Sequence, residues 1–162
     1  MKLGFLVMNV GKKAGGPETY EAALLQNLAA IDGENEYHLY CVRQGAAEAL
    51  GIDQENFAVP RLWPPTQWVN LPVTFPLMLA KDGIPFFHAP FVPPPFSLRP
   101  YVFTHHCFSP FAHPEFYDPA VLARLKHLLV KGLKHASLVL CVSQNVLDLT
   151  AENLGIAREK MR

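Results

Sequence analysis

The amino-acid sequence predicts a three-layer α/β/α fold with a mainly parallel sheet of about six or seven strands. Short apolar segments typical of buried strands alternate with amphipathic segments typical of helices, which favours a parallel sheet covered on both faces. No internal repeat, low-complexity tail or change of composition divides the 162 residues, half of which are hydrophobic. We therefore expect residues 1–162 to form one domain with a sizeable core.

The first half of the chain contains three predicted strands and two predicted helices. An apolar run over residues 2–10 is typical of a strand buried on both faces. The break GKKAGG follows, and Pro17 suits the first turn of a helix. The apolar face of this helix, at spacings of three and four, consists of Tyr20, Leu24, Leu28 and Ile31. The next predicted elements are a strand over 36–43, a short helix over 45–50 and a strand over 56–60.

Prolines shape the middle of the chain. Five of them lie within residues 60–81, so any helix over 66–81 is expected to be short or kinked. Further strands are predicted over 84–89 and 101–106, joined by a proline-rich connector that is extended.

The last third of the chain predicts a helix, a strand and a second helix. Asp118 and Pro119 form a cap and a first helical residue, and the helix continues to about His135. A strand over 137–143 follows, and Ser143 caps the final helix. The apolar stripe of the first helix consists of Val121, Leu122, Leu125, Leu128, Leu129, Leu133 and Ala136.

Composition excludes several classes of protein. Lys and Arg balance Asp and Glu at 14 each, so no overall positive field attracts nucleic acid. Cys41, Cys107 and Cys141 are odd in number and two of them lie inside apolar runs, which indicates reduced, buried thiols in a cytoplasmic protein. The N-terminal apolar run is too short for a signal peptide and lacks a small-residue cleavage site. No apolar stretch approaches the roughly 20 residues that cross a bilayer.

The carboxyl ends of parallel strands meet along one edge of the sheet, because right-handed crossovers make all the strands run the same way. Ligands of such sheets bind outside that edge. The residues that follow the predicted strands, and are therefore expected there, are Gly15, Gly16, His88, His105, His106 and Ser143.

The loop GKKAGGPE ends a strand and begins a helix whose first N–H groups have no partner within the helix. Its glycines allow a ligand close to the backbone, and the helix dipole favours an anion such as phosphate, which Lys12 and Lys13 would strengthen. A plain tight turn is the alternative. The spacing matches neither the Gly-x-Gly-x-x-Gly pattern nor a P-loop.

The stretch YVFTHHCFSPFAHPEFYDP places His105, His106, Cys107 and His113 close together in the sequence. Zinc would require three or four of these side chains to converge, but neighbours in an extended strand point to opposite faces, so no metal is expected. His105 is then either a hydrogen-bonded structural group or, at the ligand edge, a group suited to proton transfer or to binding sugar hydroxyls.

Basic and aromatic side chains suggest two further contacts. Arg124 and Lys131 fall along one face of the predicted helix, which is either solvated or in contact with anionic lipid head groups or an anionic acceptor. Trp63, Trp68 and Phe91 either cover the core or line an acceptor groove.

Three stretches in order, GFLVMNVGKKAGGPETYEAALLQNL, GIPFFHAPF and the region 101–161, resemble the N-terminal domain of family 4 glycosyltransferases. These are retaining enzymes built from two facing Rossmann-like domains. The resemblance implies a Rossmann-like fold, acceptor binding by this domain, and neither a metal nor another cofactor. It also implies a nucleotide-sugar donor, held mainly by a C-terminal domain that this sequence does not contain.

The same resemblance assigns roles to individual residues. Gly15 and Gly16 would lie near the donor phosphates, and His105 would contact the donor sugar and support catalysis. His106 stands where many relatives have Asp, and Ser143 would lie at the edge of the cleft.

The missing domain has consequences for activity. Relatives carry in it two Glu residues with seven residues between them, and no Glu pair here has that spacing. We expect the chain to be inactive alone, because half of the water-excluding cleft is absent, and the uncovered face favours self-association. A non-catalytic binding or assembly module and, less favoured, a zinc-dependent hydrolase are the alternatives, since fold alone does not decide function.

Overall fold

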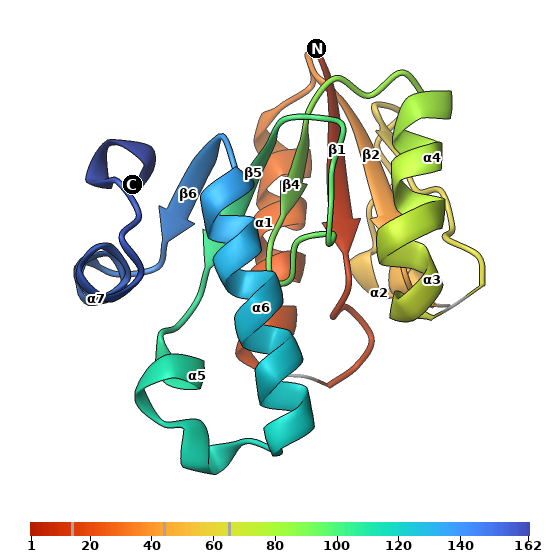
Figure 1. Cartoon of the computed structure of the whole chain (residues 1–162). Coiled ribbons are helices and arrows are strands. Elements are labelled where there is room, and N and C mark those ends of the chain that lie inside the picture. The colour runs from red at the N-terminus through yellow and green to blue at the C-terminus, as the bar shows by residue number, and fades with distance from the viewer. Residues whose placement is uncertain (14, 44, 65) are drawn as a thin grey trace.

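A six-stranded, wholly parallel sheet forms the centre of the molecule, in the strand order β3-β2-β1-β4-β5-β6. The computed structural model describes residues 1–13, 15–43, 45–64 and 66–162; Ala14 of the glycine loop and Pro65 of the proline-rich segment lie outside them. All strands point downwards in Figure 1, so their carboxyl ends share the lower edge. The predicted fold class is confirmed. The strands are β1 (Lys2–Val7), β2 (Glu36–Cys41), β3 (Phe57–Ala58), β4 (Phe87–Ala89), β5 (Tyr101–His105) and β6 (Leu138–Cys141).

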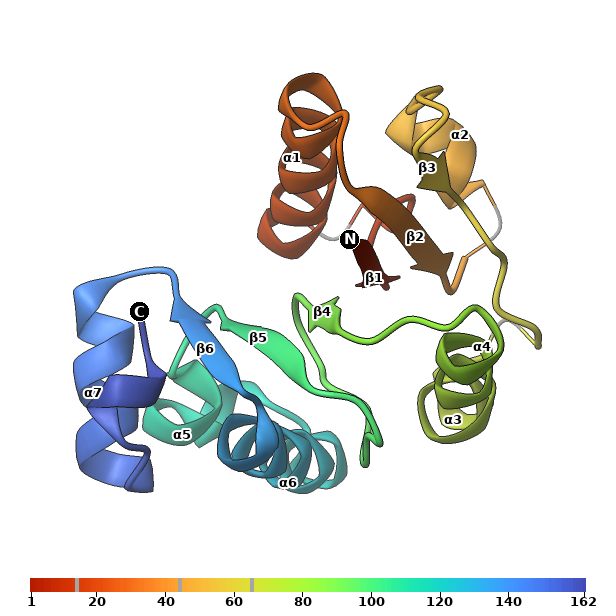
Figure 2. The same ribbon diagram turned by 90° about the horizontal axis from the view of Figure 1, so that it is seen from above.

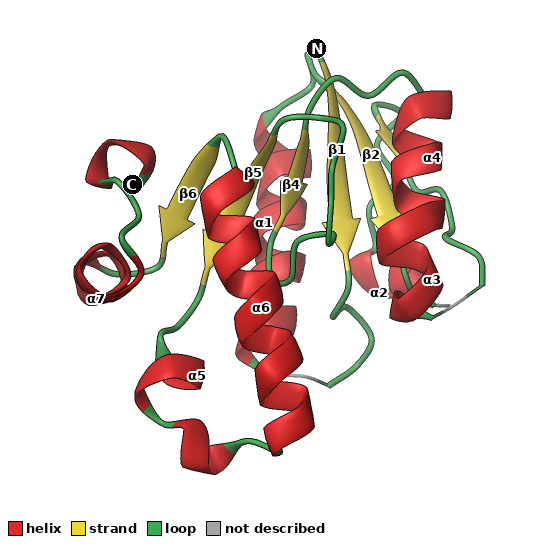
Figure 3. Cartoon of the chain, in the orientation of Figure 1, coloured by secondary structure: helices red, strands yellow, loops and turns green. Residues whose placement is uncertain are grey.

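Helices cover both faces of the sheet, as Figures 2 and 3 show. One face, called the α1 face below, is covered by α1 (Gly16–Ile31) and α2 (Ala46–Leu50). The opposite face, called the α6 face, is covered by α3 (Gln67–Val69), α4 (Phe75–Lys81) and α6 (Pro119–His135). The remaining helical segments are α5 (Ser109–Ala112), α7 (Gln144–Leu154), the π-helical turn η1 (Asn70–Thr74) and the 3-10 turns η2 (Pro114–Phe116) and η3 (Arg158–Lys160).

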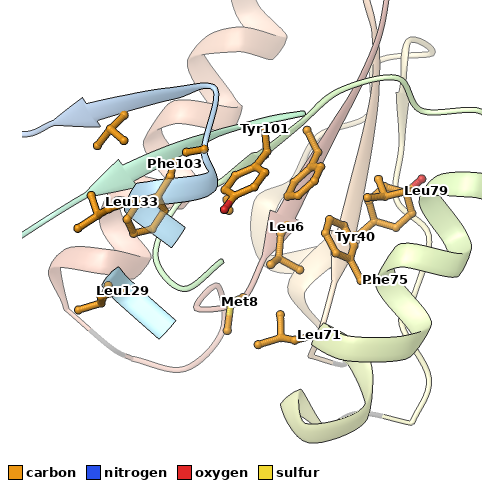
Figure 4. Packing of buried hydrophobic residues seen from close by; sticks show 14 of the residues in the cluster. Leu6, Met8, Tyr40, Leu71, Phe75, Leu79, Tyr101, Phe103, Leu129 and Leu133 are labelled. Atoms are coloured by element: carbon orange, nitrogen blue, oxygen red, sulfur yellow. The ribbon is translucent and has the colours of Figure 1, made fainter. Parts of the chain in front are cut away.

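The strands divide their side chains between two hydrophobic clusters. Along β1, Phe5 and Val7 join the cluster of the α1 face, whereas Leu6 and the following Met8 join that of the α6 face. This alternation is the two-residue period of a strand buried on both sides. Figure 4 shows the α6-face cluster, where aromatic rings from a helix and two strands pack in sequence: Phe75, Phe87 and Tyr101.

Local sequence signals for helix ends are confirmed. The Asp118 carboxylate accepts the N–H groups of Ala120 and Val121 at the start of α6. The Ser143 hydroxyl accepts the N–H of Val146 at the start of α7. The proline-rich segment is a succession of the short helix α3, the π-helical turn η1 and α4, as its interrupted pattern predicts.

Several predicted boundaries are too long. The strand predicted over 2–10 ends at Val7, the one over 56–60 spans two residues, and the one over 84–89 begins at Phe87. The last is shortened because the N–H of Ile84 donates to Leu79 at the end of α4 instead of to a strand. The strands expected over 36–43, 101–106 and 137–143 end at Cys41, His105 and Cys141.

Two residues assigned to apolar helix faces lie outside the core. Ile31, in the last turn of α1, is 79% exposed, and Val121, in the first turn of α6, is 59% exposed. Both stand in a terminal turn of their helix, where the apolar periodicity continues but the side chain is not covered.

Candidate functional site

The first turns of α1 lie against the carboxyl end of β5. The Tyr20 hydroxyl is 3.1 Å from the Thr104 hydroxyl, and the Tyr20 ring meets the His106 ring edge-on, with 4.8 Å between their centroids. Because Tyr20 follows the glycine loop by one helical turn, these contacts bring the loop and the histidines to the same edge. This edge, with Gly15, Gly16, His105 and His106, is the candidate site.

His105 is the last residue of β5 and pairs in register with Cys141 of β6. Its side chain is buried beneath α6, with only 1% of the residue exposed. The Nε2 atom is buried and has no hydrogen-bond partner among the residues that the structure describes. Burial, and secondarily the neighbouring His106, lowers the pKa of His105 to about 4, so the ring is neutral at pH 7. His105 thus offers an uncharged, unsatisfied nitrogen.

A small pocket of about 80 Å³ adjoins His105. Cys107 lines its wall, with the thiol 3.1 Å from the Ser109 hydroxyl, which is itself 2.6 Å from the Tyr117 hydroxyl. Leu125 and Leu129 of α6 close the opposite side. The pocket is therefore mostly apolar, with its polar groups supplied by residues 105–117.

His106 points away from His105. Its Nε2–H donates to the Pro90 carbonyl at 2.5 Å, and its ring lies near both Tyr20 and Phe91. Burial lowers the pKa of His106, and the bond to Pro90 partly offsets the effect. Opposed rings do not share an ion, and no group of three or more His, Cys, Asp or Glu among the described residues is arranged to hold a metal.

The prediction that His88 lies at the carboxyl edge is wrong. His88 is the middle residue of β4, in register with Phe5 and Val102, and its ring packs edge-on against Phe5 at 5.2 Å. Its Nε2 lies 2.8 Å from the hydroxyl of Thr104. Burial lowers its pKa to about 4. His88 is a satisfied, neutral core group that supports β5 from the α1 face.

The glycine loop is open to the outside. Gly15 has φ 67° and ψ −130°, a backbone conformation that is essentially restricted to glycine. A Cβ placed on Gly15 or Gly16 would meet no atom of the described, non-adjacent residues within 4 Å. Lys13 is exposed with a positive φ of 56°, and Lys12 is half-buried, with a pKa lowered by burial. The loop therefore has room for a ligand beside its backbone.

Glu21 is a site-supporting residue that the sequence interpretation missed. Its buried carboxylate accepts the N–H groups of Met8, Asn9 and Val10 at 3.2, 2.7 and 3.2 Å, and the Asn9 side-chain amide at 2.6 Å. These bonds replace a strand ladder, which is why β1 ends at Val7. The sequence spacing could have indicated that Glu21 is buried, because it lies four residues before Leu25 and shares its buried helix face.

Carboxylates of the chain itself reduce the number of N–H groups that the predicted phosphate-binding loop has for a ligand. Glu21 occupies the N–H groups of residues 8–10, and the N–H of Gly11 donates to Glu18 at 2.8 Å. These four donors are not available to an external anion. The anion contact predicted for the loop is therefore confined to Gly15, Gly16 and the lysines.

The remaining predicted residues occupy different places. Ser143 is exposed two residues beyond β6 and caps α7. Arg124 stacks over the Trp68 ring at 3.7 Å and so lies with α3 instead of with the histidines. Lys131 is half-buried on α6. The cysteines are free; Cys41 is buried and Cys141 half-buried, but Cys107 is exposed.

The parallel sheet, with the candidate site at its carboxyl edge, is typical of α/β domains that bind ligands at that edge. The family model described as Glycosyltransferase Family 4 matches residues 14–162. The chain belongs to this family.

A crystal structure of a glycosyltransferase from Rickettsia africae ESF-5 is similar in fold, with a TM-score of 0.57 at 14% sequence identity. The similarity covers 99% of this chain and 41% of that one, so this chain spans less than half the length of that glycosyltransferase. No curated protein sequence matches the chain. In the described part of the chain, no helix is long and apolar enough to cross a membrane.

Proposed function

We propose that this chain is the acceptor-side domain of a cytoplasmic glycosyltransferase that transfers a sugar from a nucleotide-sugar donor with retention of configuration. Family membership supports glycosyl transfer. The observation that carries the site assignment is the unpartnered Nε2 of His105 at the carboxyl edge. A buried polar atom without a partner costs about 1–3 kcal/mol, a cost that a bound substrate hydroxyl removes.

The chemistry requires positioning and charge stabilisation. In a retaining transfer the bond between the anomeric carbon and the nucleotide phosphate breaks, and the acceptor oxygen bonds to that carbon on the same face. The acceptor proton passes to the leaving phosphate, so the domain needs no strong base of its own. Its contribution is to orient both substrates and to stabilise developing charge.

Each site residue has a role that fits its surroundings. His105, neutral at pH 7, forms a hydrogen bond with a hydroxyl of the donor sugar without adding charge. Gly15 and Gly16 lie against the leaving phosphate, because the loop backbone is open there, whereas the N–H of Gly11 already donates to Glu18. Lys12 and Lys13 supply positive charge nearby. His106 and Ser143, at the same edge, complete the rim to which substrates bind.

The domain acts together with a second one. In this proposal the donor nucleotide binds mainly to a C-terminal domain, and the site described above closes over the sugar and the acceptor. A chain with only half of the cleft leaves water in contact with the reacting bond and does not turn over by itself.

An NMR titration tests the assignment on the chain itself. Nucleotide sugars with different bases and hexoses are added to the ¹⁵N-labelled chain, and the expected result is a set of amide shifts confined to Gly15, Gly16, His105 and His106. His105→Ala should reduce them at least severalfold, whereas His135→Ala, at the exposed end of α6, should not. Saturable shifts confined to other parts of the chain would contradict the site assignment.

A further inference from the structure

Charge is divided unequally between the two faces, although the chain is neutral overall. Residues 59–136, which include the helices of the α6 face, contain seven Lys or Arg and three Asp or Glu. Residues 16–55, which include both helices of the α1 face, contain one Arg and eight Asp or Glu. Between Asp82 and Glu115 there is no acidic residue at all. The α6 side is therefore basic and the α1 side acidic.

The basic side also carries a continuous row of exposed apolar side chains. We name as the tryptophan ridge the outward residues Trp63, Trp68, Val69, Val73 and Leu77. Trp63, Trp68 and Leu77 are each about two-thirds exposed, at 66%, 69% and 64%. Val69, Val73 and Leu77 lie four residues apart along α3, η1 and α4, with Trp68 beside Val69, and the inward residues Leu71, Phe75 and Leu79 of the same segment fill the core. The ridge is thus one side of an amphipathic helical segment.

An arginine accompanies each tryptophan of the ridge. The Arg61 guanidinium lies 5.6 Å from the Trp63 ring centre, and that of Arg124 lies 3.7 Å from the Trp68 ring centre. Indole rings prefer the boundary between lipid chains and head groups, and a guanidinium binds phosphate oxygens through paired N–H donors. Each Trp–Arg pair therefore offers a ring suited to the boundary between lipid chains and head groups and a cation suited to the head-group phosphates.

We infer that the tryptophan ridge, with Arg61 and Arg124, docks peripherally on a bilayer rich in anionic phospholipids. The exposed apolar side chains of the ridge would insert among the lipid head groups, and the basic side would be attracted to the negatively charged membrane surface, as in interfacial amphipathic helices. The acidic α1 side is repelled and faces away. In Figure 1, α3 lies near the carboxyl ends of β1 and β2, so docking through it brings the carboxyl edge of the sheet close to the bilayer. The inference is independent of the proposed function.

Intrinsic fluorescence tests the inference directly, because Trp63 and Trp68 are the only tryptophans in the chain. Vesicles of phosphatidylcholine alone, or mixed with phosphatidylglycerol, are titrated into the chain. Expected results are a blue shift of the emission and co-sedimentation with the anionic vesicles, both decreasing as salt is raised. Absence of both signals, or equal binding to the neutral vesicles, would overturn the inference.

Matched variants distinguish lipid binding by the ridge from non-specific hydrophobic adsorption. Arg61→Gln and Arg124→Gln should each weaken partitioning about fivefold, and Trp68→Ala and Leu77→Ser should weaken it further. The controls are Ile31→Ser, an equally exposed apolar residue on α1, and Lys2→Gln, an exposed cation of β1; neither should change binding. If ridge variants and controls behave alike, or if the emission shifts with protein concentration in the absence of lipid, the surface is not a lipid-docking site. Circular dichroism verifies that each variant is folded.

Discussion

The glycine loop and the end of β5 lie at the same edge of the sheet but differ in their exposure and in their hydrogen bonding. The loop is open at Gly15 and Gly16, and its inner N–H groups are already satisfied by Glu18 and Glu21. His105 is closed beneath α6 and retains an unsatisfied nitrogen. The difference suggests a division of labour. The loop offers an open backbone to a ligand, whereas His105 is reached through the small pocket lined by Cys107, Leu125 and Leu129.

The largest predicted effect concerns the buried histidines. The pKa values of His88 and His105 are lowered from 6.5 to about 4, so below pH 6.5 the unfolded chain takes up protons that the folded chain does not. The free energy of unfolding should therefore fall as the pH decreases. We expect a loss of about 2 kcal/mol for each histidine between pH 7 and pH 5. Urea unfolding at several pH values measures it.

Single substitutions divide this pH effect between the two residues. His88→Asn and His105→Asn should each remove about half of the slope with pH. A slope unchanged in both variants would show that the two histidines take up protons equally in the folded and unfolded chain, contrary to the effect expected of their burial.

The next largest effect is expected from the loop anchor. Glu21→Ala leaves buried N–H groups at the end of β1 without an acceptor, which should lower the free energy of unfolding by about 3 kcal/mol. Glu48→Ala, at an exposed position of α2, is the control and should change it by less than about 0.5 kcal/mol. Equal stability of the two variants would mean that the loop is not held by Glu21.

The two adjacent glycines should respond differently. Gly15→Ala forces a side chain into a glycine-only conformation and should cost about 1–3 kcal/mol of stability. Gly16→Phe projects into open space, so the fold should remain while binding of nucleotide sugar weakens strongly. Thermal unfolding and the NMR titration measure the two effects. Normal binding by Gly16→Phe would exclude a ligand from the open side of the loop.

The smallest effect is expected at the start of α7. Ser143→Ala removes a helix cap and should lower the free energy of unfolding by about 1 kcal/mol, and Ser143→Asp should restore it. Denaturant titration of the three proteins measures this. If Ser143→Asp is no more stable than Ser143→Ala, capping does not account for the residue.

The sequence predicted features set by local chemistry and failed where tertiary contacts decide. Asp118 and Ser143 were recognisable as caps because capping depends on a few neighbouring residues. The burial of Ile31 was predicted wrongly, because periodicity does not reveal which terminal turn of a helix is left uncovered. His88 was misplaced because β4 stops short of its neighbours: His88 pairs with Phe5 and Val102, which lie two and three residues before the ends of β1 and β5.

The candidate site was predicted in outline and not in its details. The alternation of strands and helices was sufficient to bring the glycine loop and His105 to one edge. It could not show that a carboxylate from α1 satisfies the start of that loop, nor that His105 faces α6 while His106 faces α1. Those features depend on side-chain packing across elements far apart in the sequence.

The measurement that tests the central claim most directly is the ring ¹⁵N spectrum of the histidines during a nucleotide-sugar titration. The Nε2 resonance of His105 should indicate a neutral ring in the free chain and should shift as the nitrogen gains a hydrogen-bond partner. The His88 ring, already bonded to Thr104, should remain unchanged and serves as an internal reference. A His105 ring that does not respond while nucleotide sugar binds at Gly15 and Gly16 would contradict the account.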